Sequence, residues 1–367
     1  MFEVADVLRR YGAEYLQTFQ QRMPSEHRRA IRDLLQCRTP ALGGHVFACD
    51  HCGKLQYSYH SCRNRSCPKC HTSDTQAWLK ARQKDLLPVP YYHVIFTVPH
   101  ELNVLARQHR KEVYGLLIQS AGQSLVKLAA DPHYVGGRVG VMAVLHTWGS
   151  NLAYHLHVHC LVTGGGLASD GQTWMPARED YLVPVQALSR LFRGQFLDRI
   201  GRQFPALRLP DGLWQKDWVV HCKPAVQGTG TVLAYLARYI HRVAITNSRI
   251  LSIEDGRVTF RYRPTGTAET KSMTVSATEF IRRFLQHVLP AKVHKVRYYG
   301  LWSPAHRKHL RAMQQLLTEP VTEEPEEPQE DPDPQAPAPP ESRPCPYCQI
   351  GMLIWIRRLP RQGRAPP

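Results

Sequence analysis

Six of the ten cysteines lie between Cys37 and Cys70, in a glycine-containing stretch with little apolar periodicity. Such a stretch buries too little apolar surface to fold alone and usually requires a metal ion. It contains two Cys-x2-Cys knuckles separated by 14 residues. Each knuckle can present two thiolates to one Zn²⁺ while backbone amides soften the charge. The spacing predicts one structural zinc site of the zinc-ribbon kind with four ligands: Cys49, Cys52, Cys67 and Cys70.

Other residues near this predicted site leave alternatives open. Cys37, His45 and Cys62 can form a second site or replace one of the four ligands. Buried free cysteines are the alternative to zinc, although they do not normally repeat the knuckle spacing. Arg63 and Arg65 lie beside the knuckles and predict contacts with DNA phosphates, unless they only form a solvated charged face.

The charge of the chain indicates a polyanionic partner. The 367 residues carry a formal net charge of +17. Residues 319–341 hold nine acidic and no basic residues, so the rest of the chain carries +26. A folded protein with such a surplus is suited to DNA, RNA or an anionic membrane. No apolar run is long enough for a transmembrane helix and the N-terminus does not resemble a signal peptide, so we expect a cytoplasmic protein that associates with the nucleoid when bound to DNA.

The pattern along the chain predicts an α+β protein in four parts. Residues 1–87 read as two helices followed by the zinc-binding module, and residues 88–317 as strands alternating with helices. Residues 318–344 are acidic and proline-rich, which predicts a disordered linker. Residues 345–367 form a short basic tail whose single Cys345-x2-Cys348 knuckle has no assigned partner.

A histidine-rich strand supplies the second candidate metal site. In residues 154–162 the side chains alternate, so apolar residues face a core while His155, His157 and His159 share the other face. Three imidazoles in a row form a platform for a metal ion, and an exposed polar face is the alternative. If Ser150-Asn151 is a two-residue hairpin loop, His146 lies opposite His155 on this face and is the candidate third ligand. His93, on the strand predicted at residues 91–98, is the alternative third ligand.

A predicted helix at residues 229–244 carries the candidate nucleophiles. One face is apolar, and the opposite face collects four residues at helical spacing: Tyr235, Arg238, Tyr239 and Arg242. A tyrosine oxygen can attack a phosphodiester and form a phosphotyrosine, and the two arginines can bind the phosphate. Packing of both tyrosines against a neighbouring element is the alternative interpretation.

The combination resembles the HUH endonucleases, in which a hydrophobic residue separates two metal-binding histidines and a tyrosine helix follows. Here the triplet is His157-Val158-His159. Over nearly the whole chain the sequence is similar to the two-tyrosine, rolling-circle transposases of the insertion-sequence-ninety-one family. The similar segments are CRTPALGGHVFACDHCG, SCRNRSCPKC, HVIFTVPHEL, LHTWGSNLAYHLHVHCLVTGGG, YLARYIHRVAITNSRI and VRYYGLWSPAHRKHL.

This resemblance implies a fold and a reaction. The fold is a central antiparallel sheet flanked by helices, preceded by a zinc module that recognises element-end DNA. His157, His159 and a third ligand bind Mg²⁺ or Mn²⁺, which polarises the scissile phosphate of single-stranded or hairpin DNA. Tyr235 and Tyr239 match the two tyrosines that attack in turn, each forming a 5′-phosphotyrosine and a free 3′-hydroxyl.

Three other functional classes remain as alternatives. A metal-dependent hydrolase also uses an HxH strand, but such sites usually place an aspartate close behind the histidines, and here Cys160-Leu161-Val162-Thr163 follows. A zinc-dependent DNA-binding regulator explains the charge and the cysteines but leaves the histidine face without a role. A plasmid replication initiator or relaxase shares the chemistry but not necessarily this zinc module.

Overall fold

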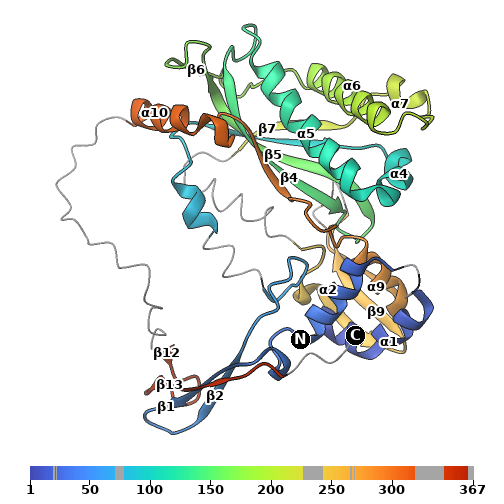
Figure 1. The fold of residues 1–367 in the computed structure, drawn as a ribbon, viewed down its shortest axis with the longest axis vertical. Coiled ribbons are helices and arrows are strands. Elements are labelled where there is room, and N and C mark those ends of the chain that lie inside the picture. Colours follow the sequence, from blue (N-terminus) through green and yellow to red (C-terminus); the bar gives the residue numbers. More distant parts are fainter. Residues whose placement is uncertain are drawn as a thin grey trace, which may run out of the picture.

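The computed structural model of the protein describes residues 1–19, 21, 23–70, 78–225, 243–264, 267, 269–318 and 343–362. Figure 1 shows these residues as an upper lobe around a large sheet and a lower part that contains both ends of the described chain. Three sheets are present within the described ranges.

The central sheet of the upper lobe is antiparallel throughout. Its order is β11-β4-β5-β3-β7, and the short strand β6 pairs with β5. The strands are β3 (Tyr91–Thr97), β4 (Arg138–Trp148), β5 (Tyr154–Leu167), β6 (Trp174–Pro176), β7 (Val220–Pro224) and β11 (Val296–Gly300). The long strands β4 and β5 lie at its centre, so the predicted histidine strand is a central strand rather than an edge.

Helices cover one face of this sheet, as Figure 1 shows for α5 and α6. Alternate residues of β4 and β5, such as Val141 and Val158, are fully buried in the core beneath them. The other face carries the histidines and is partly covered by Trp78, from a helix described over residues 78–83, and by Trp302. The elements around the sheet are η3 (His100–Leu102), α4 (Asn103–Gln108), α5 (Arg110–Ala129), α6 (Val185–Gln203), α7 (Gly212–Gln215), η5 (Pro304–His306) and α10 (Arg307–Leu317).

A second core joins the N-terminal helices to a later part of the chain. Apolar residues of α1 and α2 pack with α9 and the sheet β10-β9-β8, as Ile31, Phe260 and Phe280 illustrate. The structure therefore differs from the predicted division at residue 87, because the N-terminal helices share a core with residues beyond 243. The elements are α1 (Val4–Phe19), α2 (Ser25–Gln36), η4 (Asn247–Arg249), β8 (Ile250–Glu254), β9 (Arg257–Tyr262), β10 (Lys271–Ser276) and α9 (Ala277–Leu285).

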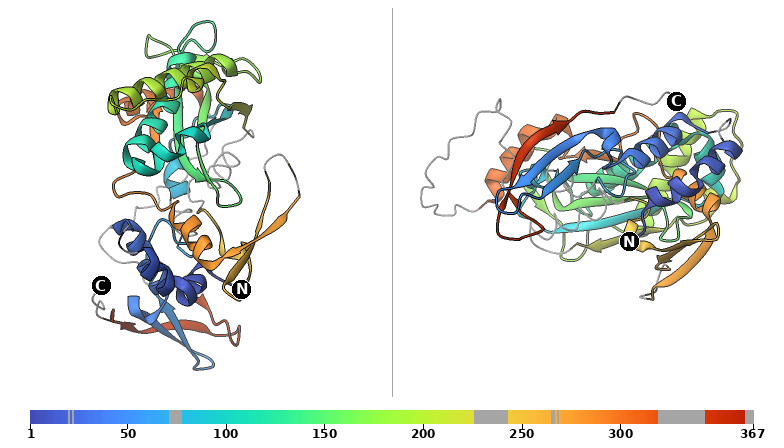
Figure 2. Two further views of the ribbon diagram at one scale, coloured as in Figure 1. Left: turned by 90° about the vertical axis from the view of Figure 1, so that its right-hand side faces the viewer. Right: turned by 90° about the horizontal axis from the view of Figure 1, so that it is seen from below.

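The third sheet combines strands from the N-terminal and C-terminal parts of the chain. Its order is β12-β13-β1-β2, and Figures 1 and 2 show the red C-terminal strand beside the blue N-terminal strands. The described part of the predicted tail, residues 345–362, is therefore not separate, because β13 pairs along the whole length of β1. Residues 319–342, most of the predicted linker, lie outside the described residues. The elements are η2 (Pro40–Leu42), β1 (Gly44–Cys49), β2 (Leu55–Tyr59), β12 (Arg343–Pro344) and β13 (Met352–Leu359).

The expected mixture of helices with antiparallel sheets is confirmed. The predicted strands at residues 91–98 and 154–162 correspond to β3 and β5, and the two predicted N-terminal helices to α1 and α2. None of the described helices combines the length and the apolar character that crossing a membrane requires.

Close packing of α5 on β11 predicts a size limit at Gly122. A Cβ at this position would lie 2.2 Å from Cδ2 of Tyr299, so Gly122→Ala must displace the ring or the helix. Overpacking of this kind costs about 1–3 kcal/mol. Thermal unfolding of the variant should therefore show a lower Tm than the parent protein.

Gly201 on α6 offers the matched control for this substitution. Outside its own helix, no described atom lies within 4 Å of the place that a Cβ would occupy, and the residue is exposed. Gly201→Ala should raise stability by about 0.5–1 kcal/mol, because alanine is the better helix former. Equal effects of the two substitutions would contradict the close contact between α5 and Tyr299.

Candidate functional site

Three imidazoles meet on the face of the central sheet that is turned away from α5 and α6. His146 comes from β4, whereas His157 and His159 come from β5, and one nitrogen from each lies within 4.8 Å of the others. His146 is only 2% exposed, and the other two are partly buried. One divalent cation fits among three nitrogens at such separations. His155 shares the strand face but is exposed and outside this histidine cluster.

The pairing of β4 with β5 brings His146 to this cluster. His146 lies directly opposite His157, and Val144 lies opposite His159. The predicted pairing of His146 with His155 through a two-residue loop is wrong, because the register shifts between His146 and Trp148 and the connection is longer. The difference amounts to two residues, so His146 keeps the predicted face of the strand.

Neighbouring groups hold two of the imidazoles in place. Nδ1 of His157 lies 3.0 Å from the carbonyl oxygen of His155, and Nδ1 of His159 lies 2.9 Å from Nε2 of His93. A proton on Nδ1 of His157 donates to that carbonyl and leaves the lone pair on Nε2, which is the tautomer that binds metals. His93 therefore contacts a cluster histidine from β3 and is not itself a member of the cluster, unlike the alternative considered from the sequence. Burial lowers the pKa of His93 to about 4, so its imidazole is neutral at pH 7.

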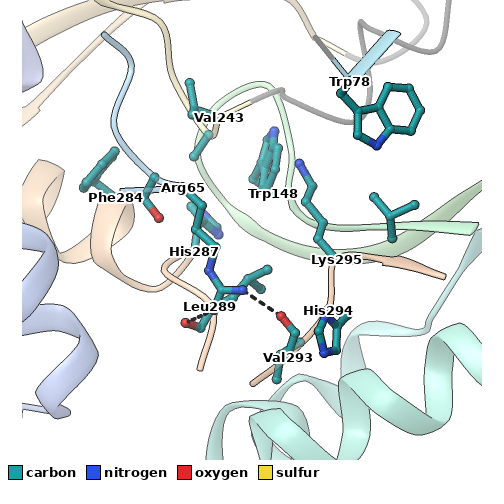
Figure 3. A pocket seen from close by; sticks show the side chains of 13 residues that line it. Arg65, Trp78, Trp148, Val243, Phe284, His287, Leu289, Val293, His294 and Lys295 are labelled. Atoms are coloured by element: carbon teal, nitrogen blue, oxygen red, sulfur yellow. Dashed lines mark hydrogen bonds between the residues drawn. The ribbon is translucent and has the colours of Figure 1, made fainter. Parts of the chain in front are cut away.

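A cavity of about 340 Å³ lies beside Trp148, a neighbour of the histidine cluster (Figure 3). Trp148 lines it and also stacks on His146, with ring centroids 4.7 Å apart. The ammonium group of Lys295 lies 5.0 Å from the centroid of the Trp148 ring. The wall thus combines an aromatic surface with cationic side chains, a combination that suits nucleic acid.

His287 is a buried residue that lines this cavity. Its Nδ1 lies 3.1 Å from Oγ1 of Thr147, and its Nε2 lies 3.2 Å from the carbonyl oxygen of Leu152. In the neutral ring, Nε2–H donates to the carbonyl and Nδ1 accepts from the hydroxyl, so both nitrogens are satisfied. Burial lowers the pKa of His287 from 6.5 to about 3.

The predicted nucleophiles lie outside the described residues, as do their neighbouring arginines. The described residues end at Ala225 and begin again at Val243, so they do not include Tyr235, Arg238, Tyr239 and Arg242. Val243 lines the same cavity as Trp148. The described chain therefore resumes at the cavity that is also lined by Trp148, the residue that stacks on His146.

Eight cysteines form two clusters of four. One cluster contains Cys37, Cys62, Cys67 and Cys70, and the other contains Cys49, Cys52, Cys345 and Cys348. The predicted site with Cys49, Cys52, Cys67 and Cys70 is therefore wrong in its grouping. β1 carries the first knuckle into the third sheet, whereas the second knuckle packs against the core of α1 and α2. Spacing along the chain could not reveal this, because each knuckle finds partners that lie elsewhere in the sequence.

The geometry of the first cluster fits a structural zinc ion. Sγ of Cys70 lies 3.5 Å from Sγ of both Cys37 and Cys62, and Sγ of Cys67 lies 3.6 Å from that of Cys37. A tetrahedral ion with Zn–S bonds of about 2.3 Å separates its sulfurs by about 3.8 Å. The cluster therefore takes up Cys37 and Cys62, which the sequence left unassigned.

The two arginines predicted to contact DNA have different environments. The guanidinium of Arg65 donates to the carbonyl oxygens of Val293 and Leu289 at 2.6 and 2.9 Å (Figure 3). It also donates to the carbonyl oxygen of Pro290 at 2.6 Å. Arg65 therefore ties the zinc-binding segment to the chain before β11, and its contact with phosphate is not tested by these hydrogen bonds. Arg63 is exposed, and its contact with phosphate stays a prediction.

Comparisons with known proteins identify relatives for most of the chain. Residues 140–309 match a family described as "Putative transposase", and residues 7–98 match a "Transposase zinc-binding domain". A putative transposase named y4qJ from Sinorhizobium fredii is 41% identical over 96% of this chain and 94% of its own length. The transposase for insertion sequence element IS801 from Pseudomonas savastanoi pv. phaseolicola is 28% identical over 74% of this chain and 68% of its own length. No solved structure matches significantly.

The buried His287 predicts that acid destabilises the protein. Because its pKa is about 3 in the folded chain and about 6.5 in the unfolded chain, only the unfolded chain takes up this proton between these values. The free energy of unfolding should fall as the pH decreases from 6.5 towards 3. Denaturant unfolding at a series of pH values measures this slope.

His287→Gln is the variant that isolates this contribution. It removes the titrating group, so the variant should lose less stability than the parent protein over the same pH range. The exposed His221 on β7 serves as a control, because His221→Gln should leave the slope nearly unchanged. An identical slope in the parent protein and His287→Gln would show that His287 is not held neutral by burial.

Proposed function

This chain belongs to the IS91 family of transposases, and we propose that it nicks and rejoins single-stranded DNA at the ends of its element through phosphotyrosine intermediates. Each cleavage conserves the energy of the broken bond, so the strands can be rejoined without ATP, and we propose that this chemistry drives rolling-circle transposition. The substrate is single-stranded or hairpin DNA at the element ends and at the target site. The enzyme acts on the DNA of the cell, so we place it in the cytoplasm at the nucleoid.

The histidine cluster is the observation that carries this proposal. His146, His157 and His159 provide three nitrogen ligands that converge within 4.8 Å. With only three protein ligands, a bound ion would keep further coordination positions for water and phosphate oxygens, as an HUH nuclease requires. Because Mg²⁺ prefers oxygen ligands, we expect Mn²⁺ to bind this nitrogen-rich site more tightly than Mg²⁺. When bound, the ion would polarise the scissile phosphate and stabilise its developing charge.

The protein groups around the cluster have positioning roles in this proposal. The carbonyl of His155 fixes the ring of His157, and His93 fixes the ring of His159. Trp148 covers His146 and lines the adjoining cavity, where the chain that carries the two tyrosines resumes at Val243. These contacts hold the imidazoles ready before DNA binds.

Tyr235 and Tyr239 are the proposed nucleophiles. The tyrosine hydroxyl gives up its proton as its oxygen bonds to phosphorus and the bond between phosphorus and the 3′-oxygen breaks, and the released 3′-oxygen takes up a proton, so no net proton is gained or lost. The 5′-phosphate stays on the tyrosine until a 3′-hydroxyl attacks it and restores a phosphodiester. Two tyrosines allow the donor and target strands to be held together, and Arg238 and Arg242 are proposed to bind their phosphates.

Covalent capture of DNA tests the nucleophile assignment. The full chain is incubated with labelled single-stranded DNA from the element ends and Mn²⁺, and the products are separated in SDS. A labelled protein band is expected, and the double variant Tyr235→Phe/Tyr239→Phe should abolish it. An adduct that persists in the double variant would exclude both tyrosines. Absence of any adduct in the parent protein, with DNA binding intact, would favour a zinc-dependent regulator.

The same assay tests the proposed metal ligands. His146→Ala and His157→Ala should each reduce adduct formation at least about 100-fold, since catalytic metal sites rarely tolerate loss of a ligand. Chelation by EDTA should abolish the adduct, and added Mn²⁺ should restore it. His133→Ala, which changes an exposed histidine away from the cluster, should retain the parent rate. A parent-like rate in His146→Ala would remove His146 from the proposed ligand set.

A further inference from the structure

The second cysteine cluster lies partly outside both regions that match known families. Cys49 and Cys52 fall within the zinc-binding match, but Cys345 and Cys348 lie beyond residue 309, where the putative transposase match ends. We propose that these four cysteines form a second zinc site, which fastens the C-terminal strand β13 to the N-terminal strand β1. The protein would then hold two zinc ions per chain.

Sulfur–sulfur distances favour a metal over disulfides in this cluster. Sγ of Cys49 lies 3.6 Å from Sγ of Cys348, and Sγ of Cys52 lies 3.8 Å from Sγ of Cys345. Tetrahedral zinc requires about 3.8 Å, whereas a disulfide requires about 2.0 Å. Four thiolates are a soft donor set, which favours zinc over the oxygen-seeking divalent ions.

The two halves of the site are built as matching knuckles. In each half, the residue after the second cysteine has a positive φ, +69° at Gly53 and +59° at Gln349. The amide of each donates to the carbonyl of the first cysteine of its knuckle, at 3.0 Å in both cases. Two separate parts of the chain thus adopt the same turn, with their thiols directed to one point.

Backbone amides also donate to the sulfurs of this cluster. The amides of Cys52 and Tyr347 donate to the first sulfur of their knuckles, each at 3.4 Å, and the amide of Gly351 donates to Cys348 at 3.5 Å. Such N–H groups spread the negative charge of coordinated thiolates and stabilise them. They are the donors that a metal-bound knuckle needs.

The C-terminal knuckle docks directly on the N-terminal one. The amide of Met352 donates to Oδ1 of Asp50 at 2.8 Å, and the amide of Asp50 donates to the carbonyl of Met352 at 3.1 Å. A Cβ on Gly351 would lie 2.4 Å from Oδ1 of Asp50 and 2.6 Å from Sγ of Cys49. Only glycine allows the knuckles to approach this closely.

Zinc at this position would link the C-terminal knuckle to the N-terminal knuckle. Cys52 and Cys345 are 293 residues apart in sequence, and β13 continues from the knuckle along β1 from Leu353 to Leu359. The entropic cost of bringing distant segments together grows only with the logarithm of their separation, so one tetrahedral site can fasten them. The pairing of β13 with β1 should therefore depend on the metal.

Zinc analysis of the purified full chain tests this site. The parent protein should contain two zinc ions per chain, and Cys345→Ser/Cys348→Ser should contain one. Cys222→Ser is the matched control, because Cys222 is partly buried but belongs to neither cluster, and it should retain two. One zinc in the parent protein, or two in Cys345→Ser/Cys348→Ser, would overturn the proposal.

Hydrogen exchange provides a readout at the strand itself. In Cys345→Ser/Cys348→Ser the amides of β1 that pair with β13 should exchange at least about tenfold faster, while β4 and β5 keep the parent rates. Gly351→Val leaves all four thiols in place but obstructs the knuckle contact, and it should show the same local effect with reduced zinc content. Unchanged exchange in β1 for both variants would contradict a metal that fastens β13. Because neither measurement uses DNA cleavage, the result is independent of the proposed nuclease activity.

Discussion

Antiparallel pairing of β4 with β5 is the constraint on which the candidate active site depends. The pairing sets His146 opposite His157 and brings the ring of His159 within reach of both. Because side chains alternate along a strand, the same register that buries Val141 and Val158 under α5 and α6 turns the imidazoles to the opposite face of the sheet. The register of β4 with β5 therefore determines which side chains form the core of the upper lobe and which histidines can bind the proposed metal ion.

Rigidity around the histidines comes from neighbours that do not themselves belong to the cluster. His93 on β3 holds His159, the carbonyl of His155 holds His157, and Trp148 stacks on His146. Burial keeps His93 neutral at pH 7, so it adds no competing positive charge beside a bound cation. This arrangement suits a site that must receive the anionic phosphate of DNA with little rearrangement.

Local patterns in the sequence were sufficient for β3, β5, the two N-terminal helices and the face of the histidines. Alternation within residues 154–162 depends only on neighbouring residues, so it predicted β5 correctly. Knuckle spacing also identified paired cysteines, but it could not show that Cys49 and Cys52 meet Cys345 and Cys348, because that contact depends on the path of the whole chain. The hydrogen bonds from Arg65 to three carbonyl oxygens could not be predicted from the sequence for the same reason.

A crystal of the full chain grown with Mn²⁺ and single-stranded element-end DNA would test the central claim most directly. Anomalous scattering recorded at the manganese edge locates the ion without reference to any assumed ligand. We expect one strong peak bonded to nitrogens of His146, His157 and His159, with a DNA phosphate oxygen completing its coordination. A manganese peak bound elsewhere, with these three imidazoles free of metal, would contradict it.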